Sequence, residues 1–152
     1  MKSINKQADN MGGVIRLWAI PPADISIAGK KATILSDTNL VDIYIKEDSA
    51  SFTEELVKSF AGSSYKVDIA AIVPADTPET LAQIADMERR SKYIVIYLDG
   101  NGAYKLAGTS KVPLRFGSKS STGQGAVALS HYELSFSGLQ HKRAVFIENP
   151  FA

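Results

Sequence analysis

Residues 51–70 read SFTEELVKSFAGSSYKVDIA, and this stretch decides between a β-rich and a helical chain. Residues 65–70 alternate strictly between apolar and polar side chains, as a strand with one buried face does. In residues 51–60 four apolar side chains also stand at helical spacing, so a helix is the alternative there: Phe52, Leu56, Val57 and Phe60. We favour a strand over 51–60, because the Gly-containing turn 61–64 would then join two strands as a hairpin.

Apolar stretches before this hairpin predict further strands. Residues 14–20 are β-branched and aromatic and are stopped by Pro21-Pro22, which predicts a strand with an extended exit. Two short strands are expected at 25–27 and 32–35, and the alternation over 41–46 predicts another. The polar residues 1–12 predict a flexible N-terminal arm, so that 13–152 would form a single β-rich domain.

One helix is predicted after the hairpin. Asp76 is placed to cap the first turn, Pro78 stands where its missing N–H does no harm, and Glu79 follows three residues after the cap. The apolar stripe is expected to consist of Leu81, Ile84 and Ala85. A basic pair that suits the C-terminal end of the helix dipole closes the element: Arg89 and Arg90.

The second half of the chain predicts strands in succession. They are expected at 92–98, 103–108, 112–116, 126–136 and 143–147, with a tight turn at 99–102 and a mobile loop at 117–125. Along 126–136, His131, Glu133 and Ser135 would share one face. Tyr132, Leu134 and Phe136 would share the other. The predicted fold class is mainly β (α+β): a β-sandwich or partly open barrel with one flanking α-helix.

Composition excludes several classes of protein. The chain has 152 residues and a formal net charge of +1. It has no cysteine, so disulfide frameworks and thiolate metal sites are excluded. A near-zero charge argues against a chain whose main task is to neutralise a nucleic-acid backbone. No apolar stretch approaches the roughly 20 residues of a membrane span, and no secretory signal is visible, so we expect an intracellular product without a membrane partner.

Candidate catalytic and ligand-binding patterns are weak. His131 and His141 are the only imidazoles, and nothing like a nucleophile elbow accompanies them. The stretch 99–102 resembles a calcium-binding loop only in its first positions. Residues 117–123 have the composition of a phosphate-binding loop but lack its Gly-Lys-Ser/Thr order. Asp48, Glu54 and Glu55 are expected to be surface charges. The sequence therefore predicts no catalytic residue, no cofactor and no metal.

The best candidates for contacts to phosphates or to assembly partners are basic. Lys105, Arg115 and Lys119 would gather on neighbouring strands, together with Lys111. Tyr104 and Phe116 stand between them, which is a pattern typical of single-stranded nucleic-acid binding. The alternative function is accordingly a small β-barrel binding module for nucleic acid or a small ligand.

The order of short segments over residues 50–148 resembles the small structural proteins of tail and neck genes in phages and prophages of Bacteroidota. The segments that carry this resemblance are Gly62…Tyr65-Lys66-Val67, Val73-Pro74, Arg89-Arg90, Tyr93-Ile94-Val95-Ile96, Asp99-Gly100-Asn101-Gly102, Tyr104 to Gly108, Pro113-Leu114-Arg115, Ser121-Thr122-Gly123 and Tyr132 to Gly138.

The resemblance implies a non-enzymatic virion component with a tail-tube-like β-fold. Such a tail tube or head–tail connection protein would assemble into a homo-oligomeric ring and meet other phage tail or neck proteins. Genome DNA would pass through the ring without sequence-specific contacts. The expected location is the virion, and the bacterial host cytoplasm during assembly. The family supplies no catalytic residues to carry over.

Overall fold

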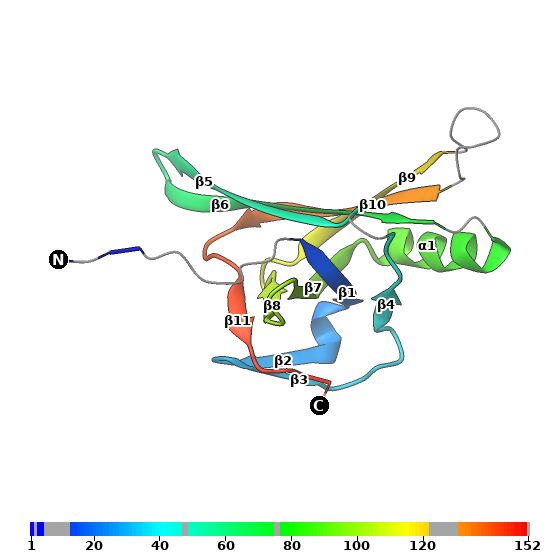
Figure 1. Cartoon of the computed structure of the whole chain (residues 1–152), viewed down its shortest axis with the longest axis horizontal. Helices are drawn as coiled ribbons and strands as arrows, with labels where there is room; N and C mark the ends of the chain where they lie inside the picture. Colours follow the sequence, from blue (N-terminus) through cyan, green and yellow to red (C-terminus); the bar gives the residue numbers. More distant parts are fainter. Residues whose placement is uncertain (2, 5–12, 47–48, 75–76, 122–130, 152) are drawn as a thin grey trace.

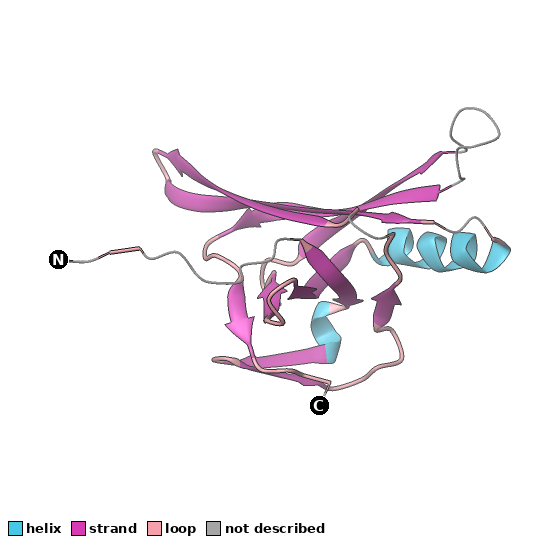
Figure 2. Cartoon of the chain, viewed as in Figure 1, coloured by secondary structure: helices cyan, strands magenta, loops and turns pink. Residues whose placement is uncertain are grey.

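A computed structural model gives the fold of the chain and describes residues 1, 3–4, 13–46, 49–74, 77–121 and 131–151. The strands are β1 (Val14–Ile20), β2 (Ile25–Ala28), β3 (Lys31–Ile34), β4 (Val41–Ile43), β5 (Ser51–Ser59), β6 (Gly62–Val73), β7 (Lys92–Asp99), β8 (Tyr104–Ala107), β9 (Leu114–Ser121), β10 (His131–Gln140) and β11 (Val145–Ile147). A 3-10 turn η1 (Pro22–Asp24) and the helix α1 (Pro78–Arg90) complete the elements. The expected β-rich class with one helix is confirmed (Figure 2).

Nine strands within the described residues form one antiparallel sheet that folds into two layers. The central layer contains β4, β1, β7, β8 and β11, and the outer layer contains β9, β10, β6 and β5. The layers join where the first two residues of β7, Lys92 and Tyr93, pair with Arg115 and Leu114 of β9. Beyond this junction β7 pairs with β1 instead, so the sheet separates into a partly open sandwich (Figure 1).

The central layer is buried on both faces, which explains the nearly continuous apolar run of β7. Its upper face packs against the outer layer and α1 around Leu17, Val95 and Phe136 in the main core. Its lower face packs against the β2–β3 hairpin around Trp18 and Ile96 in a second core. The hairpin lies below the central layer in Figure 1, so the fold has three layers of strands.

The decisive hairpin is confirmed as two long strands. Each residue from Ser51 to Ser59 pairs with one from Ala70 to Gly62, so 51–60 is not a helix. The helical spacing of Phe52, Leu56 and Phe60 has no packing partner to match it, because only Phe52 reaches the main core. Pairing with β6 therefore decides the local structure.

The helix begins one residue later than the sequence predicts. The cap is Thr77, whose Oγ1 accepts the Thr80 N–H at 3.2 Å, so the prediction of an Asp76 cap with Glu79 in a capping box is wrong. The predicted stripe is also wrong in part. Ile84 is buried, but Leu81 is 55% exposed and Ala85 is also exposed, while the buried partner is Met87. Leu81 and Met87 lie on opposite flanks of Ile84, about 120° apart, and α1 turns the Met87 flank inward.

Several strand boundaries and one exit also differ from the predictions. The loop expected at 117–125 is wrong in its first part, because β9 continues to Ser121 along β10, and residues 122–130 lie outside the described residues. β10 continues past Phe136 to Gln140, because β6 offers partners as far as Tyr65. The strand expected over 41–46 ends at Ile43, after which the Lys46 N–H donates to Ile72 of β6. β9 begins only at Leu114, and β11 begins only at Val145. The second proline of the expected extended exit begins η1 instead.

Candidate assembly surfaces

The β5–β6 hairpin provides a free sheet edge and an exposed apolar tip. Among the described strands only β6 pairs with β5, so the other edge of this nine-residue strand is open. The far half of the hairpin extends beyond the central layer at the left of Figure 1. Leu56 is 42% exposed there, and Phe60 at the turn is completely exposed. Long open edges and apolar protrusions are features that soluble monomers usually avoid.

The near half of the hairpin is fixed to the central layer by two contacts. The ring of Phe52 lies 4.9 Å from that of Tyr97 on β7, centroid to centroid. Glu54 accepts the Ala144 N–H at 2.7 Å and an N–H of Arg143 at 2.9 Å, with only 10% of its side chain exposed. Arg143 also lies over the ring of Tyr65, 4.7 Å from its centroid. The direction in which the hairpin projects is therefore set by residues of β7 and of the β10–β11 connection.

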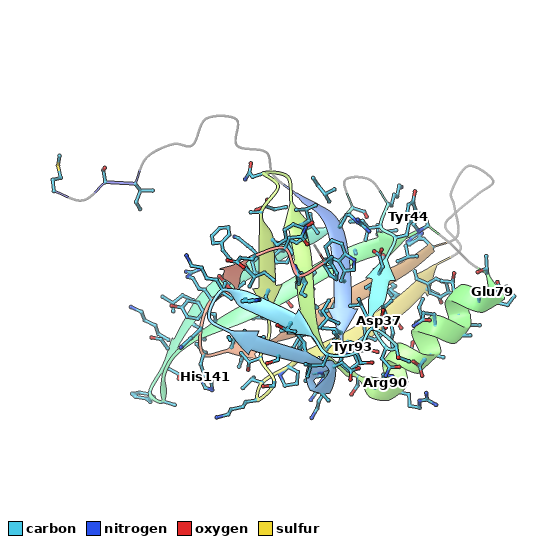
Figure 3. The ribbon with its side chains drawn as sticks, turned by 90° about the horizontal axis from the view of Figure 1, so that it is seen from below. Asp37, Tyr44, Glu79, Arg90, Tyr93 and His141 are labelled. Atoms are coloured by element: carbon cyan, nitrogen blue, oxygen red, sulfur yellow. The ribbon has the colours of Figure 1, made fainter. Side chains whose placement is uncertain are left out.

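A groove of about 310 Å³ lies between β4 and α1. Its floor consists of Ile84 and Met87 of the helix with Val73 and Leu134 of the outer layer, and all four are buried. Its rim carries four exposed residues, Asp42, Tyr44, Glu79 and Gln83, and the half-buried Thr80. Figure 3 places Tyr44 and Glu79 at the end of the molecule that α1 occupies. This groove was not predicted from the sequence.

The outward face of the outer layer carries mostly small and polar side chains. A row of small residues crosses it in register: Gly117, Ser135, Ala70 and Ser51. A Cβ atom at Gly117 would lie 2.9 Å from the Ser135 Oγ, so there is no room for a larger residue beside Ser135. No described element covers this face in Figure 1. A shallow hollow of about 500 Å³ lies along it, with Lys119 and Glu133 at one side.

The predicted basic residues do not lie on neighbouring strands. Lys105 is on β8 and Arg115 and Lys119 are on β9, while β7 lies between these two strands. The Lys105 ammonium lies over the ring of Phe146, 4.5 Å from its centroid. Arg115 and Lys119 are both exposed on the outward face of β9, beside Ser137 and Glu133 of β10. Arg115 and Lys119 thus share a surface that excludes Lys105.

The two aromatic residues of the same sequence pattern belong to the cores. Phe116 is 7% exposed and packs against Tyr93 and Phe136 in the main core. Tyr104 stacks on Trp18 with ring centroids 6.0 Å apart, on the lower face of the central layer. The alternation of basic and aromatic residues therefore reflects the two faces of strands. It does not form a platform on which bases could stack.

The histidines and acidic residues form no cluster of metal ligands in the described ranges. His131 Nε2 lies 3.5 Å from a carboxylate oxygen of Glu133, two residues along the same strand face. His141 is exposed on the connection after β10, at the end opposite α1 in Figure 3. The turn at 99–102 is a hairpin turn, in which the Asp99 carboxylate accepts the N–H groups of Asn101 and Ala103.

Two buried tyrosines have altered acidity. Burial raises the pKa of Tyr97, and the negative charges of Glu54 and Asp99 raise it further. Burial also raises the pKa of Tyr93, against the opposing effect of Arg90. Both phenols therefore stay protonated throughout the physiological pH range.

The groove was missed because its walls are distant in the sequence. β4 and α1 are separated by the whole β5–β6 hairpin, and only the sheet pairing brings them together. One signal was present in the sequence: Met87 follows Ile84 by three residues, which places a second large apolar side chain on that face. Residues 2 and 5–12 of the predicted arm and residues 122–125 of the predicted loop lie outside the described residues.

Comparisons with protein-family models, with curated proteins and with solved structures found no match to this chain. In the described ranges, no helix has both the length and the apolar character that crossing a bilayer requires.

Proposed function

We propose that this chain is a non-enzymatic structural subunit of a phage or prophage virion. It would assemble into a homo-oligomeric ring as a component of the tail tube or of the head–tail connection. The observation that carries the proposal is the β5–β6 hairpin, which projects from the body with an open edge and an apolar tip. The phage-specific part rests on the ordered resemblance of residues 50–148.

Self-association is the physical consequence of such a hairpin. An open edge of nine residues presents unpaired N–H and C=O groups that another strand or subunit can cover. The apolar tip gains free energy when a partner removes it from water. Where the hairpin of one copy contacts a different surface of the next copy, the contact repeats and leads to a ring or to a filament.

The remaining partners follow from the location of such a ring. Other tail or neck proteins would meet its two faces, and the genome would pass through its centre without sequence-specific contacts. Arg115 and Lys119, which are exposed on the outward face of the outer layer, are the basic residues available for assembly or phosphate contacts there. Lys105 would contribute elsewhere, because it lies on the central layer.

Sedimentation velocity over a wide range of protein concentration tests this function. The full chain should form a defined oligomer of several copies, either alone or when co-expressed with the products of the neighbouring genes. Those genes should encode further tail or neck components. A chain that stays monomeric up to millimolar concentration, alone and with those products, would refute the proposal.

A further inference from the structure

The molecule carries an apolar protrusion and an apolar groove at opposite ends of its long axis. The protrusion is the tip of the β5–β6 hairpin, centred on Phe60. The groove is the one between β4 and α1. Both views place the hairpin tip at one end and α1 at the other (Figures 1 and 3). We infer that the groove receives the hairpin tip of a second copy, with Phe60 inside it and Lys58 beside Glu79.

The hairpin tip has the shape of an inserting element. Ser59 and Gly62 form the last pair of the hairpin, so only Phe60 and Ala61 lie between the strands. With only two residues between the strands the turn is narrow, and Gly62 has a positive φ of 116° there. Phe60 is thus the one large side chain of the turn, and its whole surface is open to a partner.

The groove has the chemistry that an aromatic ring requires. Its volume of about 310 Å³ is open to solvent above an apolar floor that includes Ile84 and Met87. A methionine thioether and aliphatic side chains adapt well to an inserted ring. Tyr44, which is 77% exposed at the rim, can pack against the edge or face of that ring.

Charge complementarity identifies a second copy as the occupant. Lys58 stands two residues before Phe60, and Glu79 lines the groove at the start of α1. Both are exposed, and neither belongs to an ion pair observed among the described residues. The other carboxylate of the groove, Asp42, is already paired with Arg16 at 2.8 Å. Insertion of the tip would therefore bring an unpaired cation to an unpaired anion.

The contact is heterologous, because the tip and the groove are different surfaces. A heterologous contact repeats from copy to copy and closes into a ring when the rotation permits. That the repeated contact closes into a ring rests on the proposed function. The contact itself requires only two copies of the chain.

Two complementary variants test the contact. Phe60→Asp removes the apolar tip and leaves the groove intact, whereas Gln83→Trp fills the groove from an exposed position of α1 and leaves the tip intact. Each variant alone should self-associate at least about thirtyfold more weakly than the parent, as expected when an aromatic anchor is lost. Mixed together, they should form a one-to-one pair and nothing larger. Mass photometry and sedimentation velocity measure both results.

Control variants separate this contact from general effects of surface change. Leu35→Asp alters another exposed apolar side chain, 63% exposed and outside both features, and should leave assembly unchanged. Lys58→Glu should weaken assembly, and combining it with Glu79→Lys in the same chain should restore it. All variants should keep the circular dichroism spectrum of the parent, because each position is exposed.

The outcomes distinguish the inference from the proposed function. Rings that persist unchanged in Phe60→Asp would overturn the inference and leave the proposed function standing. A one-to-one pair from the mixed variants, with only open chains from the parent, would support the contact and contradict the ring. A parent that never associates would overturn both.

Discussion

Removal of the Glu54 carboxylate should release the anchored half of the β5–β6 hairpin. In the structure this carboxylate accepts one N–H from the backbone of Ala144 and one from the side chain of Arg143. Only 10% of the Glu54 side chain is exposed, compared with 57% of the Arg143 side chain. Glu54→Ala therefore leaves a partly buried backbone N–H without its acceptor and opens the space between β5 and the β10–β11 connection.

The size of the effect follows from these two contacts. A hydrogen bond to a charged group contributes about 1.5–3 kcal/mol to the free energy of unfolding. The ion pair with the largely exposed Arg143 adds at most about 1 kcal/mol. We therefore expect Glu54→Ala to lower the free energy of unfolding by about 2–4 kcal/mol. Glu54→Gln keeps one acceptor oxygen and should lose less than half of this amount.

Urea unfolding followed by the fluorescence of Trp18, the single tryptophan, measures this difference. Trp18 is 5% exposed in the second core, so its emission reports loss of the central layer. The matched control is Glu55→Ala, because Glu55 is the adjacent glutamate on the exposed face and should change stability by less than about 0.5 kcal/mol. Equal effects of the two substitutions would refute the assigned role of Glu54.

Other predictions concern the helix and the tyrosines. Thr77→Ala should cost about 1 kcal/mol of unfolding free energy by removing the helix cap, and thermal melting that does not change would contradict the cap. Met87→Ala should cost about 2–5 kcal/mol, but Leu81→Ala less than about 0.5, in urea titrations; the reverse order would mean that α1 buries its other flank. The raised pKa of Tyr97 means that the unfolded chain loses this phenolic proton first, so the contribution of Tyr97 to stability should be constant below about pH 10 and fall above it. Tyr97→Phe should reduce that fall, and an equal alkaline loss of stability in both proteins would contradict the assignment.

The strands of the hairpin could be predicted because their sequence pattern and their packing agree. Residues 65–70 alternate in the sequence, and in the structure Val67 and Ile69 are buried while Lys66 and Asp68 are exposed. The alternation along β10 is confirmed for the same reason, with Tyr132 buried beside an exposed Glu133. Where one face of a strand meets the core, the alternation of apolar and polar residues shows which side chains face inward.

Other features depend on partners that are distant in the sequence. Ser118 and Ser120 have little intrinsic preference for a strand, and β9 continues through them because β10 pairs with it from the far side of residues 122–130. The sequence favours Asp76 over Thr77 as the helix cap, because aspartate is the more strongly preferred N-cap residue, and only the backbone geometry assigns the cap to Thr77. The groove was beyond prediction because its floor combines α1 with β6 and β10.

Electron microscopy of the purified full chain, imaged at increasing protein concentration, tests the central claim most directly. The account predicts closed rings of identical subunits in which the β5–β6 hairpin of each copy reaches the β4–α1 end of the next. Particles that remain single compact monomers at every concentration, alone and with the products of the neighbouring genes, would contradict it.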